Sequence, residues 1–264
     1  NGFKTNYYIS PQIWASREGR IKKIKRDIDA MYVILPFEKE FYEKKHGYPV
    51  QFVGHPLIDA IENTPIVDEA TFRKENGLDA ENPIIALLPG SRRQEVQKML
   101  DVMLSIKGDF PDYQFVIAGA PSLPDEFYSP FLKGNKVGYI PNKTYSLLKH
   151  SHAALVTSGT ATLETALFEI PQVVCYKGNW ISYQIAKRII TLDFISLVNL
   201  IMEKEVIKEL IQNELTSKNL KKELSKIVAG KERERILEDY KILKEKLGGK
   251  GASQLAAQFI VENA

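Results

Sequence analysis

Residues 153–169 read AALVTSGTATLETALFE, and this stretch has the pattern of a strand, a tight turn and a helix in direct succession. The first five residues are small or apolar and predict a short buried strand, whereas the Ala/Leu/Glu-rich run after the turn has helical spacing. The turn, Ser158-Gly159-Thr160, would present free backbone N–H groups at the positive end of the helix dipole, with two hydroxyls beside them. Such a turn suits an anionic ligand.

Glu164 follows Thr160 by one helical turn, so its carboxylate is expected near the start of the helix. A carboxylate repels phosphate, but it accepts hydrogen bonds from a diol, as the acidic residue of dinucleotide-binding folds does from ribose. Ser, Gly or Thr followed by Glu is also the pattern of an ordinary capped helix. Taken alone, the stretch favours this capping alternative.

A second stretch of the same design begins at residue 84. Residues 84–88 (IIALL) predict another buried strand, and the turn Pro89-Gly90-Ser91 leads to Arg92, Arg93 and a helix-like run at 94–107. Guanidinium groups bind diphosphates through paired, charge-assisted hydrogen bonds. One turn that offers cations and one that offers a carboxylate therefore predict the two ends of a single bound nucleotide.

Strand and helix patterns alternate from residue 83 to residue 176, which predicts βαβ units and a parallel sheet. Ligands of such sheets bind at the carboxyl ends of the strands, where both turns lie. Residues 58–83 are polar and loop-rich, so we place a domain boundary near residue 60. Further strands are expected at 6–10, 31–35 and 50–53, further helices at 17–29, 37–45 and 180–190, and a helical tail from 203 with a last helix at 252–262.

Composition limits the classes of function. The 264 residues include 36 basic and 33 acidic side chains, and a net charge of +3 gives no general attraction to nucleic acid. The single cysteine, Cys175, excludes an internal disulfide, and the four histidines show no metal-ligand spacing. No apolar run approaches the ~20 residues of a membrane span. We expect a protein without a metal site that is soluble or peripheral to a membrane.

One basic run has a specific alternative to an ordinary surface. In residues 17–29, isoleucines recur at helical spacing and basic side chains occupy the other faces. These basic residues are Arg20, Lys22, Lys23, Lys25 and Arg26. A solvated helix face is the simplest interpretation, attraction to an anionic lipid surface is the more specific one, and nucleic-acid binding ranks third because aromatic residues are not interleaved.

Six stretches, in this order, resemble the lipid-A-disaccharide synthase family, whose members are bacterial sugar transferases of the GT-B fold. They cover nearly the whole chain and are specific only in combination. The stretches are Tyr8-Ile9-Ser10-Pro11 with Trp14-Ala15, Leu35-Pro36-Phe37-Glu38, Phe52-Val53-Gly54-His55-Pro56-Leu57, Leu87-Leu88-Pro89-Gly90-Ser91-Arg92, Ser158-Gly159-Thr160-Ala161-Thr162-Leu163-Glu164 and Ser196-Leu197-Val198-Asn199-Leu200.

The resemblance implies an α/β, GT-B-like architecture in three parts. Residues 1–60 would be the remnant of an N-terminal, acceptor-side Rossmann-like domain whose first part is absent. Residues 61–230 would form the UDP-sugar-binding domain around a Rossmann-type parallel sheet. Residues 231–264 would form C-terminal helices that pack back on the N-terminal domain or, in a homodimer, on a partner chain.

The resemblance also implies a reaction. A 2,3-diacylglucosamine would move from its UDP donor to the 6-hydroxyl of 2,3-diacylglucosamine 1-phosphate, with inversion, to give a β-1,6 disaccharide and UDP. No metal or other cofactor and no nucleic acid is implied, and the expected location is the cytoplasmic face of the inner membrane, bound peripherally to its anionic surface.

Roles follow from the resemblance residue by residue. Arg92 would clamp the diphosphate in a turn shaped by Gly90 and Ser91, and Glu164 would bind the ribose hydroxyls. Ser158, Gly159 and Thr160 would form the helix-terminus site. Asn199 would add a polar group at the donor site, although an amide at this position also suits a residue that holds its own turn.

The family's glycine-rich loop and the acidic residue proposed as its catalytic base have no counterpart in the chain, so we assign no catalytic base and expect it upstream of Asn1. Two alternatives remain. One is another UDP-sugar enzyme of the same fold, either an N-acetylglucosamine epimerase or the transferase that completes the cell-wall precursor. The other is a nucleotide-binding fragment without activity.

Overall fold

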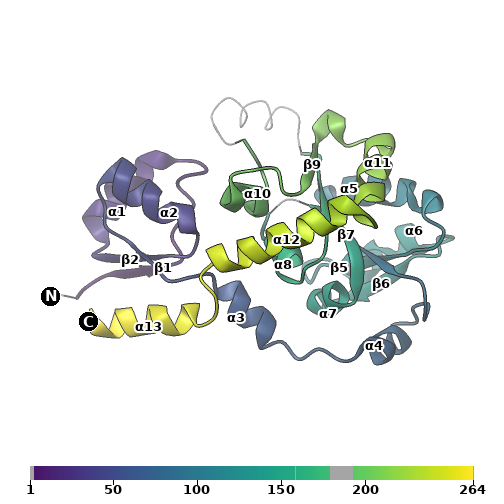
Figure 1. The fold of residues 1–264 in the computed structure, drawn as a ribbon, viewed down its shortest axis with the longest axis horizontal. Helices are drawn as coiled ribbons and strands as arrows, with labels where there is room; N and C mark the ends of the chain where they lie inside the picture. The colour runs from purple at the N-terminus through teal and green to yellow at the C-terminus, as the bar shows by residue number, and fades with distance from the viewer. Residues whose placement is uncertain (1–2, 158, 179–192, 264) are drawn as a thin grey trace. The chain divides into compact units, whose positions relative to one another are not determined.

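The computed structural model describes residues 3–157, 159–178 and 193–263, and these residues divide into two compact units (Figure 1). The smaller unit contains 3–63 and 241–263, and the larger contains 64–157, 159–178 and 193–240. The last residues of the chain thus belong to the same unit as the first. The helix at 180–190 that the sequence predicts lies outside the described residues.

The smaller unit is built on a parallel sheet with the order β1-β2-β3 among the described residues. Its strands are β1 (Asn6–Tyr8), β2 (Ala30–Val33) and β3 (Gln51–Phe52). Its helices and helical turns are η1 (Glu18–Arg20), α1 (Ile21–Asp27), α2 (Pro36–Glu40), the π-helical turn η2 (Phe41–Lys45), α3 (Pro56–Glu62) and α13 (Ala252–Glu262).

Alternation along β2 gives this small sheet two cores. Met31 and Val33 pack with Ile21 and Ile24 of α1 in one buried cluster. Tyr32, which points to the other face, packs with α13, where its ring stacks on Phe259 with 6.1 Å between centroids. The C-terminal helix is therefore an integral layer of this unit.

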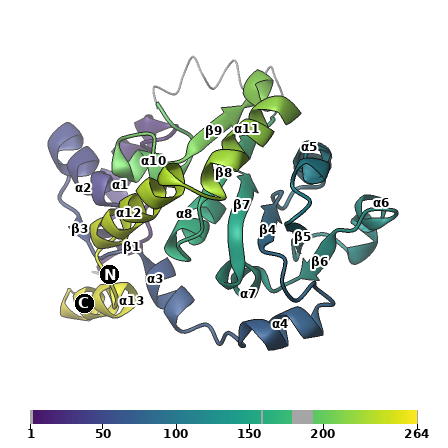
Figure 2. The ribbon, with the colours of Figure 1, turned by 45° about the vertical axis from the view of Figure 1, so that its right-hand side comes forward.

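The larger unit contains a parallel sheet of six described strands in the order β6-β5-β4-β7-β8-β9 (Figure 2). The strands are β4 (Ile84–Leu88), β5 (Gln114–Gly119), β6 (Gly138–Pro141), β7 (Ser151–Thr157), β8 (Gln172–Tyr176) and β9 (Lys208–Ile211). β4, β5 and β6 extend the sheet in one direction, and β7 returns to the other side of β4. The connections after β4 and β7 consequently diverge, which opens a crevice at the carboxyl edge of these two strands.

Both faces of this sheet are buried, as its continuous apolar strands require. On one face Ile84, Ala86 and Leu88 pack in a cluster that includes Leu147 and Leu148 of α7. The helices and helical turns of the unit are α4 (Glu69–Glu75), α5 (Arg93–Ser105), η3 (Lys107–Asp109), η4 (Asp125–Phe127), α6 (Ser129–Leu132), α7 (Thr144–Lys149), α8 (Thr160–Leu167), α10 (Leu197–Met202), η5 (Gln212–Glu214), α11 (Ser217–Ile227) and α12 (Lys231–Lys246), of which α12 belongs to this unit as far as Tyr240.

Residues 58–83 are loop-rich, as the sequence predicts, although they include most of α3 and all of α4, and each of these short helices is capped locally. His55 Nδ1 accepts from Leu57 N at 3.2 Å, and Asp68 Oδ1 accepts from Thr71 N at 3.0 Å.

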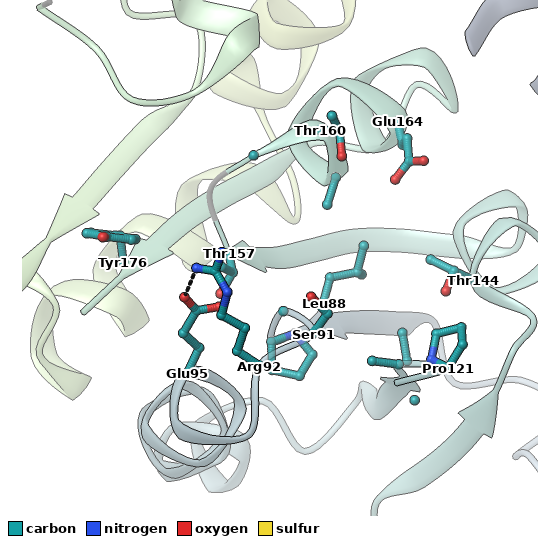
Figure 3. Close-up of a pocket in the computed structure, with 17 residues that line it drawn as sticks. Leu88, Ser91, Arg92, Glu95, Pro121, Thr144, Thr157, Thr160, Glu164 and Tyr176 are labelled. Carbon is teal, nitrogen blue, oxygen red and sulfur yellow. Dashed lines mark hydrogen bonds and ion pairs between the residues drawn. The ribbon is translucent and has the colours of Figure 1, made fainter. Parts of the chain in front are cut away.

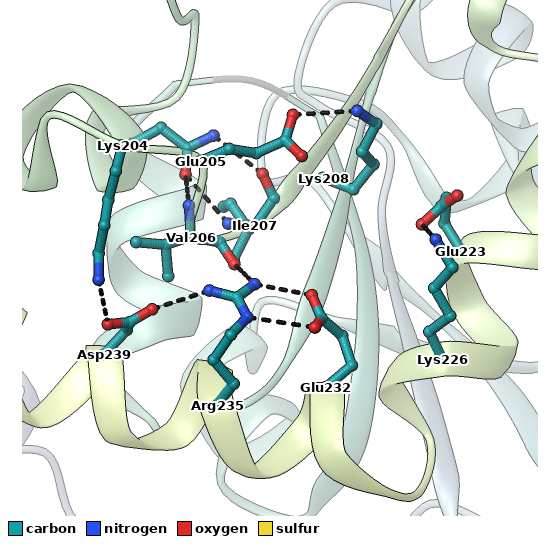
Figure 4. A network of polar contacts seen from close by, with 11 residues as sticks. Lys204, Glu205, Val206, Ile207, Lys208, Glu223, Lys226, Glu232, Arg235 and Asp239 are labelled. Carbon is teal, nitrogen blue, oxygen red and sulfur yellow. Dashed lines mark hydrogen bonds and ion pairs between the residues drawn. The ribbon is translucent and has the colours of Figure 1, made fainter.

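The prediction that the tail is helical from residue 203 onward was wrong, because β9 pairs with β8 in parallel. The loop before β9 is fastened to α12, where Arg235 donates to Val206 O at 2.8 Å and forms ion pairs with Glu232 and Asp239 (Figure 4). Among the described residues, no helix combines the length and apolar character that crossing a membrane requires.

Candidate functional site

A pocket of about 570 Å³ lies at the carboxyl edge of the large sheet, where β4 and β7 are neighbours (Figure 3). Its volume falls in the usual range of small-molecule sites. The turns after β4 and β7 and the loop after β5 supply most of its lining. The pocket thus occupies the crevice at the topological switch point.

The turn after β4 brings Gly90, Ser91 and Arg92 to the pocket. Gly90 has φ +99°, a conformation that L side chains rarely adopt, so glycine is required here. The carbonyl of Ser91 accepts a hydrogen bond from Ser122 Oγ at 2.8 Å, which ties this turn to the loop after β5. Arg92 is the extended N-cap residue of α5. The turn therefore presents a cation beside a helix N-terminus.

The Arg92 side chain is 82% exposed, and its guanidinium contacts Glu95 one helical turn later, with 3.0 Å between Nη1 and Oε1. An exposed ion pair of this kind contributes little to stability, because water screens it. Arg92 is consequently free to exchange Glu95 for an anionic ligand. Sequence reasoning did not identify Glu95 as a pocket residue, although its i+3 spacing from Arg92 was the available signal.

The turn after β7 places Gly159 and Thr160 on the opposite side of the pocket. Gly159 has φ +121°, which again requires glycine, and its carbonyl accepts from Thr162 Oγ1 at 2.8 Å. α8 is held against the sheet by the buried Gln172, whose Nε2 donates to Thr162 O at 2.9 Å. Ser158, the remaining predicted residue of this turn, lies outside the described residues.

Thr157, the last residue of β7, also lines the pocket and was missed from the sequence. Its side chain is buried, and no hydrogen-bond partner for its Oγ1 is present among the described residues. A buried hydroxyl without a partner is unfavourable unless a ligand or water supplies the missing hydrogen bond. Its position directly before the Ser-Gly-Thr turn was the signal in the sequence.

Glu164 lines the same pocket from the first turns of α8, and its carboxylate faces the cavity (Figure 3). Tyr145 of α7 donates its hydroxyl to Glu164 Oε1 at 2.9 Å. Burial, together with the charge of Glu164, raises the pKa of Tyr145 well above its usual value. The tyrosine hydroxyl therefore stays protonated and acts as a donor near neutral pH.

Asn199 is not part of this pocket. It is fully buried, its Oδ1 accepts from the backbone of Val206 and Ile207 at 2.8 and 3.0 Å, and its Nδ2 donates to Ile207 O and to Glu209 Oε1 at 2.9 Å each. Both ends of the amide are thus occupied by the polypeptide. The geometry favours the alternative in which Asn199 holds its own turn rather than a ligand.

The motif residues of the smaller unit also have internal partners. Glu38 is buried, and its carboxylate accepts hydrogen bonds from Ser10 Oγ at 2.7 Å, Trp14 Nε1 at 3.1 Å and Leu35 N at 3.0 Å. Burial raises the pKa of Glu38 despite these hydrogen bonds. Glu38 therefore joins the Ser-Pro/Trp-Ala stretch and its own Leu-Pro-Phe-Glu stretch into one hydrogen-bonded cluster.

Comparison with known proteins finds similarity to lipid-A-disaccharide synthases over nearly the whole chain. The family model described as Lipid-A-disaccharide synthetase matches residues 1–262. A lipid-A-disaccharide synthase of Trichlorobacter lovleyi is 39% identical over 271 residues, covering 98% of this chain and 69% of that protein. A lipid-A-disaccharide synthase of Coxiella burnetii is 40% identical over 231 residues, covering 86% of this chain and 60% of that protein.

Solved structures share the fold at low identity. The UDP-GlcNAc 2-epimerase of Neisseria meningitidis, solved bound to UDP-GlcNAc, has a TM-score of 0.65 and 14% identity, covering 96% of this chain and 67% of that one. The glycosyltransferase WaaG, involved in lipopolysaccharide biosynthesis, has a TM-score of 0.51 and 10% identity, covering 96% and 73%. These likenesses confirm the GT-B-like α/β fold that the sequence predicts. The family match over residues 1–262, together with the relative at 39% identity, places this chain in the lipid-A-disaccharide synthase family of glycosyltransferases.

Proposed function

We propose that this chain carries the donor site of an inverting transferase that moves 2,3-diacylglucosamine from UDP to 2,3-diacylglucosamine 1-phosphate, forming the β-1,6 lipid A disaccharide. The observation that carries this proposal is that the Arg92 turn and the Glu164 turn line one pocket. Arg92 at the N-terminus of α5 lies on one side of the pocket, and the N-terminus of α8 lies on the other with the Glu164 carboxylate one turn further along. Cations and helix N-termini suit the diphosphate of a nucleotide, and the carboxylate suits its ribose.

In this proposal the pocket acts on the leaving group. As the bond from the sugar to UDP breaks, negative charge grows on the diphosphate, and Arg92 and the first N–H groups of α8 meet that charge. Gly159 lets the diphosphate approach the backbone, and the Thr157 hydroxyl lines the pocket as a buried donor without a partner among the described residues. The step needs no metal or other cofactor. The acceptor hydroxyl also needs a base, which we do not assign.

Nucleotide binding is the first test, because it does not depend on the transfer step. UDP is titrated calorimetrically into the chain and into Arg92→Gln. Loss of the guanidinium should weaken UDP binding roughly 10- to 100-fold, the range expected for hydrogen bonds to a charged group. Arg93→Gln is the matched control, because the Arg93 guanidinium lies over the Phe127 ring at 4.8 Å and does not line the pocket. Equal UDP affinity in both variants would contradict the proposed role of Arg92 in binding the diphosphate.

Transfer is tested with UDP-2,3-diacylglucosamine and 2,3-diacylglucosamine 1-phosphate, following UDP release and the disaccharide by mass spectrometry. The assay is run on this chain and on a chain extended at its N-terminus to the length of its relatives. Disaccharide from either supports the proposal. Binding without turnover in this chain alone identifies it as a nucleotide-binding fragment. Epimerisation of UDP-N-acetylglucosamine without disaccharide would contradict the transferase assignment in favour of the epimerase alternative.

We also propose that the protein associates peripherally with an anionic membrane surface on the cytoplasmic side. The support is the run from η1 through α1, in which Ile21 and Ile24 are buried, whereas the basic side chains are exposed. Arg26 is already paired with Asp27 at 2.6 Å and Lys25 donates to His46 O, so Arg20, Lys22 and Lys23 would contribute most of the attraction. Sedimentation with anionic and neutral vesicles at low and high salt tests this, and binding that ignores both lipid charge and salt would contradict it.

We propose, finally, that the chain forms a homodimer through its C-terminal helices. α13 buries Ala252 and Ala256 but leaves Leu255 37% and Val261 76% exposed. Light scattering after size exclusion measures the mass. A dimer that becomes a monomer on Val261→Glu is the expected result, and a monomer at all concentrations would contradict the proposal.

A further inference from the structure

Glu164 is not a freely moving side chain. It is half-buried on α8, and the Tyr145 hydroxyl of the neighbouring helix α7 donates to one of its two oxygens, Oε1, at 2.9 Å. The second oxygen has no part in this hydrogen bond. The carboxylate is thereby held in one orientation, and its Oε2 accepts no hydrogen bond from the described residues, which leaves that oxygen for a ligand in the pocket.

Tyr145 itself is fixed by packing. Its ring contacts Phe168, the residue that ends α8, with 5.3 Å between centroids. Phe168 packs in turn against the buried cluster that contains Leu147 and Leu148 of α7. The tyrosine therefore contacts α8 along one helical turn, with its ring against the C-cap residue Phe168 and its hydroxyl at Glu164, four residues earlier.

The hydrogen bond from Tyr145 lowers the cost of ordering the Glu164 side chain when a ligand binds. A glutamate has three side-chain torsions, and fixing them on ligand binding costs conformational entropy. A hydrogen bond already present in the free protein removes part of that cost. The tyrosine hydroxyl also donates to the Glu164 carboxylate only from the side of α7. The side that faces the pocket can therefore accept hydrogen bonds from a neutral donor such as a diol.

We propose that Tyr145 is a positioning residue for ribose recognition, which aims the free oxygen of Glu164 at the sugar hydroxyls and so makes the pocket select a ribonucleotide over its 2′-deoxy analogue. The inference rests on the proposed function, because it requires a nucleotide in this pocket. It goes further in naming the residue that sets selectivity for the sugar of that nucleotide.

Tyr145→Phe is the appropriate variant, because it removes the hydroxyl and keeps the ring on Phe168. Calorimetric titrations with UDP and with 2′-deoxyuridine diphosphate are made on the unmodified chain, Tyr145→Phe, Glu164→Gln and the double variant. Tyr113→Phe is the control, since its ring contacts Phe110 and His152 and it does not line this pocket. Thermal unfolding of each variant verifies the fold.

We expect Tyr145→Phe to weaken UDP binding by about threefold to tenfold, the size of one supporting hydrogen bond, with little change for the deoxy analogue. The double variant should bind UDP no more weakly than Glu164→Gln, because the tyrosine acts through the carboxylate. Tyr113→Phe should bind as the unmodified chain does.

Two results would overturn the inference. One is an unchanged ratio of UDP to deoxy-UDP affinity in Tyr145→Phe, whether neither affinity changes or both fall equally, and the other is additive losses in the double variant. Failure of the proposed function looks different. In that case the unmodified chain binds neither nucleotide, or Glu164→Gln has no effect on UDP, and the role of Tyr145 falls with it.

Discussion

Two charged residues at the pocket differ in how strongly the fold holds them. Arg92 extends into solvent and is paired with Glu95, whereas Glu164 is half-buried and hydrogen-bonded to Tyr145. Preorganisation is thus concentrated at the carboxylate end of the pocket. The cationic end can rearrange when a ligand arrives.

Glu95 competes with any anion for Arg92. We expect Glu95→Gln to tighten UDP binding about twofold to fivefold, because it removes a negative charge next to the proposed diphosphate while leaving a side chain of the same size. Titration calorimetry at low and moderate salt measures the effect, which should shrink as salt increases. Weaker UDP binding by this variant would mean instead that Glu95 positions Arg92 for its ligand.

His55 should make stability depend on pH. Burial lowers the pKa of His55 from 6.5 to about 4, so the unfolded chain binds a proton between these values that the folded chain does not. The neutral His55 side chain therefore contributes fully to the free energy of unfolding above pH 6.5. This contribution, at most about 3 kcal/mol, is lost as the pH falls toward 4.

The comparison that isolates this effect is His55→Asn, which keeps a side-chain acceptor for Leu57 N–H but does not titrate. Urea unfolding at pH 7 and pH 5 should show a larger loss in the unmodified chain than in the variant. Equal losses would show that His55 is not the titrating group.

At the scale of elements, β9 and α10 depend on one buried polar cluster. Glu209 of β9 accepts from Ile195 N at 2.9 Å and from Ser196 N and Oγ at 3.0 and 2.7 Å, and it also accepts from Asn199 of α10. Ser196 in turn caps α10 by accepting from Asn199 N at 3.3 Å. A charge in this position is tolerated because each of its oxygens is hydrogen-bonded.

Asn199→Leu should accordingly lower the free energy of unfolding by about 2–4 kcal/mol, because it leaves Glu209 and two backbone N–H groups with fewer partners. The UDP affinity of the folded fraction should remain unchanged. Urea denaturation and calorimetry provide the two readouts. A variant of full stability with a large loss of UDP affinity would return Asn199 to the donor site.

At the scale of the whole molecule, the proposed ligand should act on one unit. A nucleotide that binds only the folded state stabilises it, by about 2.7 kcal/mol at 100 times its Kd. Hydrogen exchange with saturating UDP should therefore slow at 89–95 and 159–165, the turns that line the pocket. Exchange at these turns that is insensitive to UDP would place the nucleotide elsewhere.

Much of the donor-side unit could be predicted from local sequence. The strands 84–88 and 151–157 are apolar runs bounded by turn residues, and the structure has each within two residues of its expected limits. Gly90, Arg92, Gly159 and Glu164 also follow from local pattern, because a turn between a strand and a helix needs glycine and exposes its side chains at the sheet edge. Parallel pairing then brings two such turns together.

The remainder depends on partners distant in the chain. Lys208–Ile211 has the composition of the helical tail around it, and it is a strand because β8 supplies its hydrogen bonds and Ser196 and Asn199 satisfy Glu209. Tyr145 has no local signal, since it reaches Glu164 only when the sheet sets α7 beside α8. Sequence alone determined which turns carry the charges, through backbone sterics and strand periodicity, whereas the tertiary structure decided which polar groups are already satisfied and which remain available to a ligand.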